Sequence, residues 1–281
     1  MWNATAQTMP AEQLRALQTE RLLAQVRRLY DRVAFYRGRM DAEGVTPADV
    51  RTLADIRHLP FTSKYDMREV FPFGLLAVDR DEIVEVHMSS GTTGKPVVDA
   101  YTRGDLALWG DVMGRTLDMG DVGASDVVQV AYGYGLFTGG FGAHYGGQTV
   151  GAIVLPVSSG NTHRQLQTLQ DFGTTALACT PSYALYIAEY AGRNGVDPVE
   201  LPLRVGFFGA EPWSLEMRCE IEKRLGIKAY DIYGLTEIIG PGVGSECACQ
   251  DGLHIFEDHF YPEIVDPDTG EPLPDGERGE L

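Results

Sequence analysis

The stretch IVEVHMSSGTTGKP (residues 83–96) joins an alternating β-rich run to a turn of hydroxyls, glycines and one lysine. Beyond it, short β-rich runs alternate with longer segments of helical periodicity. The expected strands are IVEVHM (83–88), VVQVA (127–131), VGAIVL (150–155), TTALAC (174–179), LRVGFF (203–208) and IKAYDIY (227–233). Helices are expected around 103–118, 161–171, 181–193 and 213–225. This alternation predicts an α/β fold whose parallel-rich sheet is covered by helices on both faces.

The residues before Ile83 predict a helical N-terminal arm. Between Pro10 and Tyr30 the apolar side chains fall on one helical stripe, and the stretch to residue 82 mixes prolines with aromatic residues. We therefore expect an arm (1–82) packed on an α/β body (83–281). After Tyr233 the alternation stops, and residues 263–281 are expected to form a strand, a turn and the beginning of another strand.

Composition limits the classes of function. The 281 residues include 40 Asp and Glu against 23 Lys and Arg, a formal net charge of −17, which argues against nonspecific binding to nucleic acid or to anionic membranes. No apolar run approaches the roughly 18–20 residues of a membrane helix, and the N-terminus does not resemble a secretory signal. Four cysteines are too few and too scattered for a disulfide scaffold. We expect a cytoplasmic protein.

The loop after the first strand has the composition of a phosphate-binding turn. Glycines let backbone N–H groups converge on an oxyanion, hydroxyls donate further hydrogen bonds, and a lysine adds positive charge. It is not the P-loop of the NTPases, because that motif requires Gly at the place of Ser89 and Ser or Thr at the place of Pro96. The residues of this loop are Ser89, Ser90, Gly91, Thr92, Thr93, Gly94 and Lys95.

A second polar segment, YDIYGLTE (230–237), also follows a predicted strand. Ligands of open α/β sheets bind outside the carboxyl ends of the strands, so both segments can face one crevice. Tyr233 could stack on a base, Gly234 lets the backbone approach a ligand, Thr236 could bind a phosphate oxygen, and Glu237 could hold Mg²⁺. Read without the first segment, the same residues are an ordinary strand end.

A third segment, YGYGLFTGGF (132–141), interleaves aromatic residues with glycines after the strand VVQVA. Such a segment suits a flat aromatic ligand, although core packing explains its aromatic residues equally well. It is not a dinucleotide fingerprint, because Thr138 stands where the third glycine belongs.

Cysteine and histidine recur near the end of the chain, in the order Cys247, Cys249, His254 and His259. Thiolates and imidazoles are zinc ligands, but the separation of the two cysteines is shorter than structural zinc sites usually have. Two interpretations stay open: a structural Zn²⁺ site on Cys247, Cys249 and His254, with His144 or a cysteine as a fourth ligand, or cysteines and histidines without metal.

Taken together, SSGTTGKPVV, YDIYGLTE and DGLHIFEDHFYPEIVDPDTGEPLPDGERGEL resemble the acyl-adenylate-forming (AMP-binding) enzymes, most closely the phenylacetate–coenzyme A ligases. The segments FTSKYDMREVFPFGLLAV and YGYGLFTGGFGAHYGG fit the same family, so the resemblance covers nearly the whole chain. It implies that an aromatic carboxylate reacts with Mg·ATP to give an acyl-adenylate and pyrophosphate, after which coenzyme A displaces AMP. It also implies the large N-terminal domain of such an enzyme, and a homodimer.

The resemblance also implies roles for individual residues. Ser89 to Lys95 would cradle the β- and γ-phosphates, Thr236 would contact the α-phosphate, and Glu237 would hold Mg²⁺. Lys95, Thr236 and Glu237 would be the catalytic residues. The nucleotide site would further include Gly209, Ala210, Glu211, Asp231, Tyr233 and Gly234. The acyl site would be lined by Tyr134, Phe141, Gly209 and Ala210.

The chain departs from the family in its extent. Members continue into a ribose-binding motif and a smaller mobile domain with a catalytic lysine, so we expect an N-terminal fragment that binds ligands but is catalytically incomplete. Two other functions stay open. The acid could be transferred to a carrier protein or an amine in secondary metabolism, or the chain could be a noncatalytic module that binds a small molecule.

Overall fold

The computed structural model describes residues 1–89 and 95–281 and divides them into two compact units. The sheet unit contains Met1–Asn3 and Ile83–His254, and the arm unit contains Ala4–Glu82 and Ile255–Leu281. Residues 255–281, which the sequence analysis assigns to the α/β body, therefore cluster with the N-terminal segment instead.

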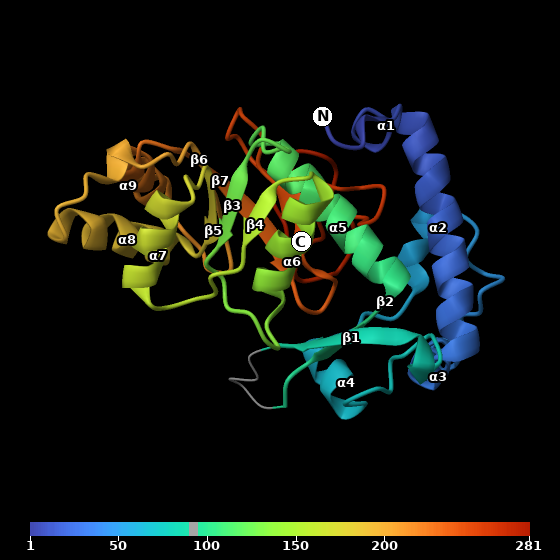
Figure 1. Ribbon diagram of the computed structural model, residues 1–281. Helices are drawn as coiled ribbons and strands as arrows, with labels where there is room; N and C mark the ends of the chain where they lie inside the picture. The colour runs from blue at the N-terminus through green and yellow to red at the C-terminus, as the bar shows by residue number, and fades with distance from the viewer. Residues whose placement is uncertain (90–94) are drawn as a thin grey trace. The chain divides into compact units, whose positions relative to one another are not determined.

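The sheet unit is built on a seven-stranded, parallel-rich sheet, which confirms the predicted fold class (Figure 1). The strand order is β4-β3-β5-β6-β7-β8-β9. Pairs from β4 to β7 are parallel, and β8 is antiparallel to β7. The strands are β3 (Val127–Val130), β4 (Ile153–Leu155), β5 (Ala176–Cys179), β6 (Val205–Phe208), β7 (Lys228–Leu235), β8 (Gly240–Ser245) and β9 (His254–Ile255).

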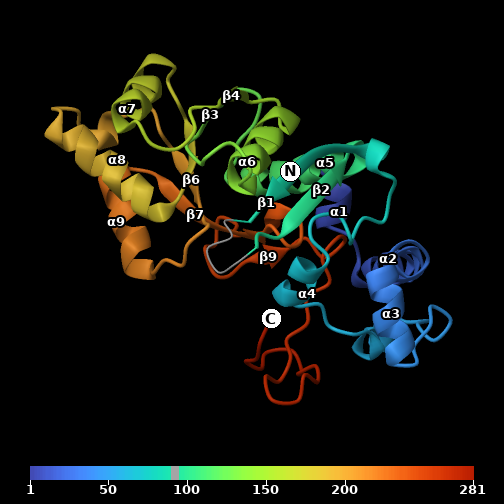
Figure 2. The same ribbon diagram turned by 90° about the horizontal axis from the view of Figure 1, so that it is seen from below.

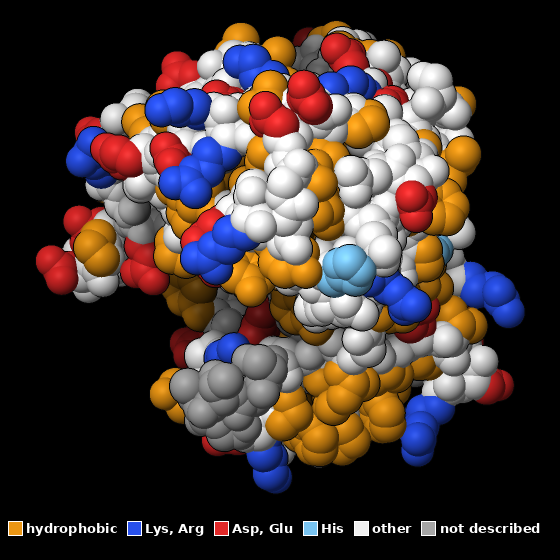
Figure 3. All heavy atoms as spheres, turned by 60° about the vertical axis from the view of Figure 1, so that its left-hand side comes forward, with side chains coloured by type: hydrophobic (Ala, Val, Ile, Leu, Met, Phe, Trp, Pro, Cys, Tyr) orange, Lys and Arg blue, Asp and Glu red, His pale blue; other side chains and the backbone are white. Residues whose placement is uncertain are grey.

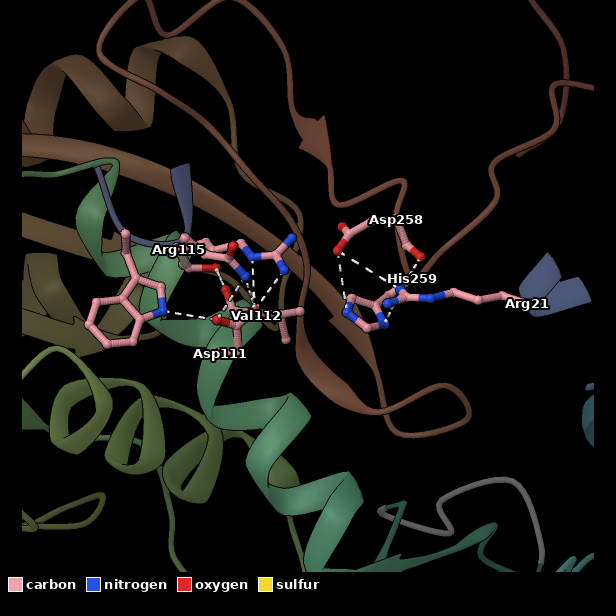
Figure 4. Close-up of polar contacts among 9 residues, drawn as sticks. Arg21, Asp111, Val112, Arg115, Asp258 and His259 are labelled. Carbon is pink, nitrogen blue, oxygen red and sulfur yellow. Dashed lines mark hydrogen bonds and ion pairs between the residues drawn. The ribbon is translucent and has the colours of Figure 1, made fainter. Parts of the chain in front are cut away.

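Helices cover both faces of this sheet (Figures 1 and 2). The helices of this unit are α5 (Arg103–Asp118), α6 (Thr138–Thr149), α7 (Thr162–Asp171), α8 (Pro181–Arg193), η3 (Pro198–Glu200) and α9 (Leu215–Leu225). Helices α7, α8 and α9 bury one continuous apolar cluster that includes Leu177, Ile187 and Phe208. Helices α5 and α6 lie on the other face. On that face the fully buried Arg115 binds Asp111 one turn earlier, with 2.6 Å between Nη2 and Oδ2 (Figure 4).

The run IVEVHM is a strand, as predicted, but it does not join the main sheet. It forms β1 (Ile83–Met88), which pairs antiparallel with β2 (Val98–Thr102) in a separate two-stranded sheet. The prediction is also wrong for the first half of VGAIVL, because only Ile153–Leu155 form a strand and the preceding residues are the turn that ends α6.

The arm unit consists mainly of helices. Its elements are α1 (Ala4–Gln7), α2 (Ala11–Arg32), α3 (Ala34–Ala42), η1 (Leu53–His58), α4 (Lys64–Glu69) and η2 (Arg80–Glu82). Its buried apolar cluster contains Val26, Met40 and Val50. On α2, Arg21 binds the backbone carbonyl of Asp258 and lies 2.9 Å from Nδ1 of His259 (Figure 4).

The last residues of the arm unit form bridges in place of the predicted regular strands. Val265 makes isolated antiparallel bridges to Pro272 and Glu280. The intervening turn is closed by the N–H of Gly270, which donates to the carbonyl of Asp266. Across residues 1–89 and 95–281, no helix is long and apolar enough to cross a membrane.

Candidate functional site

A hollow of about 440 Å³ opens at the carboxyl ends of the parallel strands β3, β5 and β6. This is the edge at which open α/β sheets bind their ligands. The hollow is lined by Ala131, Tyr132, Gly133, Phe137, Ser159, Gly160, Thr180, Ser182, Tyr183, Tyr186 and Ala210. The lining combines aromatic rings with small polar groups, so it suits a flat ligand with a polar end.

The N-terminus of α8 forms one wall of the hollow. Thr180 caps this helix by accepting from the N–H of Tyr183, and the N–H of Ser182 donates to Oε1 of Glu211 at 2.7 Å. Glu211 thus satisfies a backbone donor that the helix cannot satisfy itself. The hydroxyl of Tyr183 donates to the carbonyl of Gly160 at 3.1 Å, which fixes the ring against the hollow.

The phenol of Tyr132 is buried in the floor of the hollow, with the side chain 5% exposed. Burial raises the pKa of this phenol well above its ordinary value, although the backbone of Gly209 acts in the opposite direction. The group is therefore a neutral hydroxyl throughout the physiological range.

The ends of β6 and β7 lie side by side. Phe208 is the register partner of Asp231, and a Cβ at Gly209 would lie 2.5 Å from the carbonyl oxygen of Ile232. Glycine at 209 therefore allows this close approach. The predicted Gly209–Glu211 segment and the start of the predicted Tyr233–Glu237 segment consequently share one edge of the sheet.

The side-chain carboxylate of Asp231 is held in place by the indole of Trp213. Nε1 of Trp213 donates to Oδ1 of Asp231 at 2.8 Å. Burial raises the pKa of Asp231 above its ordinary value, while the bond from Trp213 acts in the opposite direction. Behind it, Glu246 accepts from the N–H of Asp231 and forms a buried ion pair with Arg218. The carboxylate of Asp231 is thus directed toward Trp213.

Thr236 and Glu237 lie in the turn between β7 and β8, where Thr236 is buried and Glu237 is half-buried. Tyr233 and Gly234 precede them in β7 and are half-buried. The predicted adenine, α-phosphate and magnesium residues therefore follow one another along a single strand end.

The structure describes both ends of the predicted phosphate loop, whereas Ser90, Gly91, Thr92, Thr93 and Gly94 lie outside the described residues. The N–H of Ser89 donates to the carbonyl of Val97, and Oγ of Ser89 accepts from the N–H of Val97 at 2.9 Å. The backbone and hydroxyl of Ser89 therefore close the base of the loop. Lys95 is exposed.

The predicted acyl residues separate into two places. Ala210 lines the hollow, whereas Tyr134 and Phe141 belong to an aromatic cluster beside it, with their ring centroids 5.2 Å apart. The hydroxyl of Tyr134 lies 3.1 Å from Nδ1 of His144, and burial lowers the pKa of that imidazole. Tyr132, Gly133 and Phe137, in the same segment, are the residues that line the hollow.

The structure gives no support to the zinc interpretation, which stays a prediction. Within residues 1–89 and 95–281, no group of three or more His, Cys, Asp or Glu side chains is placed to hold a metal ion. Cys249 donates its N–H to Sγ of Cys247, and Cys249 and His254 are both exposed. The cysteines are two residues apart in a turn, a separation that directs them into local contacts.

Several residues that line the hollow were not predicted from the sequence, among them Ser159, Thr180, Ser182 and Tyr183. They all follow predicted strands, so the rule that ligands bind at the carboxyl ends of strands was the signal that could have identified them. Tyr186, one helical turn further along α8, had no such signal.

Comparison with known proteins gives concordant results. The sequence profile of the AMP-binding enzymes matches residues 6–281. The chain is 52% identical over 271 residues to the phenylacetate-coenzyme A ligase of Aromatoleum evansii, covering 96% of this chain and 62% of that protein. It is 50% identical over 282 residues to the phenylacetate-coenzyme A ligase of Thermus thermophilus, covering 100% and 63%. The chain thus spans less than two thirds of the length of these relatives.

Among solved structures, that of a 2-hydroxyisobutyryl-CoA ligase in complex with 2-HIB-AMP and CoA matches with a TM-score of 0.93. The two sequences are 29% identical, and the match covers 98% of this chain and 60% of that one. The similarity therefore extends through nearly all of the present chain.

Proposed function

Because this chain belongs to the AMP-binding enzyme family, we propose that its protein activates a small aromatic carboxylic acid with ATP and passes the acyl group to coenzyme A. The acid would be phenylacetate or a close relative. The observation that carries this proposal is the aromatic-lined hollow at the strand ends of a chain that is 50–52% identical to two phenylacetate-coenzyme A ligases.

The hollow is where the ring of the acid would bind. Its size is at the lower end of small-molecule pockets, and Phe137, Tyr183 and Tyr186 offer ring edges and faces to a flat ligand. A carboxylate held at the mouth of the hollow would lie toward the ends of β6 and β7, close to Ala210.

ATP would bind across the same edge of the sheet. The Ser89–Lys95 loop would hold the β- and γ-phosphates, Tyr233 and Gly234 would contact adenine, and Thr236 would contact the α-phosphate. An oxygen of the acid would then attack the α-phosphorus, and the bond to the bridging oxygen of pyrophosphate would break. In the second step the thiol of coenzyme A would attack the acyl carbon and release AMP. Positioning and electrostatic stabilisation supply most of the acceleration in such reactions.

Glu237 fits the role of a magnesium ligand. Mg²⁺ prefers oxygen ligands and is usually held by one or two carboxylates together with substrate phosphates, so a three-residue protein site is not required. The half-buried carboxylate of Glu237 follows the strand end at which the phosphates would lie. When bound there, the ion would neutralise phosphate charge, while the chain's own residues orient the two reactants.

Isothermal titration calorimetry on the 281-residue chain tests this proposal. We expect saturable binding of Mg·ATP and of phenylacetate, with weaker binding of an aliphatic acid such as hexanoate. Phe137→Ala should weaken phenylacetate binding about fivefold to tenfold, because it removes one aromatic contact, worth about 1 kcal/mol.

Phe172→Ala is the matched control, because Phe172 is an exposed phenylalanine that does not line the hollow. This variant should bind phenylacetate as the unmodified chain does. Equal affinities for hexanoate and phenylacetate, or equal losses in the two variants, would contradict the assignment of the hollow. A chain that binds neither ATP nor any acid would contradict the function itself.

A further inference from the structure

Ala210 lines the hollow in a backbone conformation that disfavours alanine. Its φ is +68°, in the left-handed region, where the Cβ of any residue other than glycine crowds the backbone. Glycine is the usual residue at such a position, because it has no Cβ. The methyl group of Ala210 is therefore present at a cost to folding.

The other described residues with positive φ, glycines aside, all have polar side chains. They are Asn3, Asp121, Ser158, Asn161 and Gln250. Asn and Asp tolerate this region, because their short side chains can bind the local backbone. Oγ of Ser158 accepts from the N–H of Tyr134 at 3.3 Å, and the amide of Gln250 donates to the carbonyl of Ala229 at 2.8 Å. Ala210 has no polar side-chain group that could offset the cost in this way.

The chain is anchored on both sides of Ala210. On one side, a Cβ at Gly209 would lie 2.5 Å from the carbonyl oxygen of Ile232, so the backbone of β6 lies tightly against β7. On the other side, Oε1 of Glu211 accepts from the N–H of Ser182 at 2.7 Å, and the proline that follows Glu211 disfavours helical backbone there. The left-handed turn between these two anchors is made at Ala210.

A strained residue that persists at a binding site is an indication of function. Ala210 is exposed and borders the hollow just beyond the end of β6, where the carboxylate of the acid would lie under the proposed function. A methyl group at this place would contact the carbon next to the carboxylate, and it would collide with a branch on that carbon.

We infer that Ala210 is a specificity-determining residue, whose methyl group restricts the hollow to acids with an unbranched carbon next to the carboxylate. The inference rests on the proposed function, because it takes an arylacetate as the ligand. Phenylacetate meets this condition, whereas 2-phenylpropionate carries a methyl branch on that carbon. A binding pocket discriminates against one such group by roughly tenfold or more.

The test compares the 281-residue chain with Ala210→Gly. The substitution relieves the backbone, so the melting temperature should rise by about 2 °C. Phenylacetate should bind about threefold to fivefold more weakly in calorimetry, because one methyl contact is lost. The unmodified chain should prefer phenylacetate over 2-phenylpropionate at least about tenfold, and the variant about threefold or less. A substitution that stabilises the fold would thus weaken and broaden binding.

The ligand control is 4-methylphenylacetate, which carries its additional methyl group at the far end of the ring. Its affinity relative to phenylacetate should be the same in the two proteins. The variant control is Asp121→Gly, because Asp121 has a φ of +56°, is exposed and does not line the hollow. Its melting temperature should not fall, and both affinity ratios should stay as in the unmodified chain.

Three results would overturn the inference and leave the proposed function standing. The first is equal affinity of the unmodified chain for phenylacetate and 2-phenylpropionate. The second is a preference that stays unchanged in Ala210→Gly or narrows equally in Asp121→Gly. The third is a lower melting temperature of Ala210→Gly, which would mean that the left-handed backbone does not strain the alanine. A chain that binds none of the three acids would contradict both the inference and the proposed function.

Discussion

At the scale of single residues, the carboxyl group of Asp99 has an environment that should make stability depend on pH. It stands opposite His87 in the β1–β2 ladder and is mostly buried. Burial is the main cause that raises the pKa of this carboxyl to about 6, although the nearby His87 lowers it. In the unfolded chain the group would titrate near pH 4. Folding therefore favours its protonated form.

Stability should consequently depend on pH through Asp99. The contribution of the group is fully present below about pH 4 and is lost as the pH rises to about 6. Asp99→Asn keeps the shape of the protonated acid and removes this loss, so it should raise the free energy of unfolding at pH 7 by on the order of 2 kcal/mol. Urea denaturation at pH 4, 5, 6 and 7 measures the effect. The same change at exposed Asp81 should leave the pH profile unaltered, and an equal gain there would count against this explanation.

The residues around the hollow show what a sequence can identify in a site. Ala210 lies in a segment whose resemblance is specific, and the structure places it in the lining. The position of the Tyr183 ring cannot be predicted from neighbouring residues. Its hydroxyl is bound by Gly160 and Thr162, which are more than 20 residues away. Long-range contacts of this kind leave no local pattern in the sequence. The rule that ligands bind at the carboxyl ends of strands therefore indicates the region of the site but not which side chains line it.

At the scale of elements, α6 and β8 were not predicted from the sequence because both are rich in glycine. Helix α6 contains five glycines in TGGFGAHYGGQT, a composition with low helix propensity. The helix forms because it packs very closely on α5: a Cβ at Gly146 would lie 2.7 Å from Cβ of Met113. Strand β8, GPGVGS, is similar, since Gly240 and Gly242 have positive φ values. Tertiary packing decides both elements, whereas the short β-rich runs that contain β3, β5, β6 and β7 are recognisable from the sequence alone.

Gly209 offers a test of such close packing between β6 and β7. Gly209→Ala would force a Cβ to within 2.5 Å of the carbonyl oxygen of Ile232. We expect a loss of about 1–3 kcal/mol in the free energy of unfolding, the usual cost of overpacking, and weaker phenylacetate binding because Ala210 would move. Chemical denaturation and calorimetry measure the two effects.

Gly192→Ala provides the comparison, because nothing lies within 4 Å of a Cβ at this position in α8. This variant should be neutral or more stable by up to about 1 kcal/mol, since alanine is the better helix former. If both substitutions proved neutral, the contact between the ends of β6 and β7 would not constrain the strands as argued.

At the scale of the whole molecule, the net charge of −17 has to be reconciled with the proposed polyanionic ligand, ATP. Side chains of both signs are interspersed on the face shown in Figure 3, so the acidic excess does not form a single patch there. Exposed charges farther apart than about 10 Å are largely screened at ordinary salt concentration. Binding of ATP would therefore depend on local donors such as Lys95 and the backbone of the loop, and the overall charge serves solubility.

The two units differ in how much apolar surface each one buries. The cluster beneath α7, α8 and α9 contains many fully buried side chains, whereas that of the arm unit has three, Val26, Met40 and Val50. The free energy of local opening rises with the amount of buried apolar contact. Amide hydrogens of α2 and α3 should therefore exchange faster than those of β5 and β6, because their local opening requires less free energy.

Hydrogen exchange measured by mass spectrometry on two matched variants tests whether each core stabilises its own unit. Leu177→Ala removes a fully buried side chain from the sheet unit, at a cost of about 2–5 kcal/mol, and should speed exchange in β3, β5 and β6. Met40→Ala should do the same in α2 and α3 while β5 stays protected. Each core would then set the opening free energy of its own unit. Faster exchange throughout the chain in either variant would instead mean that the described residues unfold as one cooperative body.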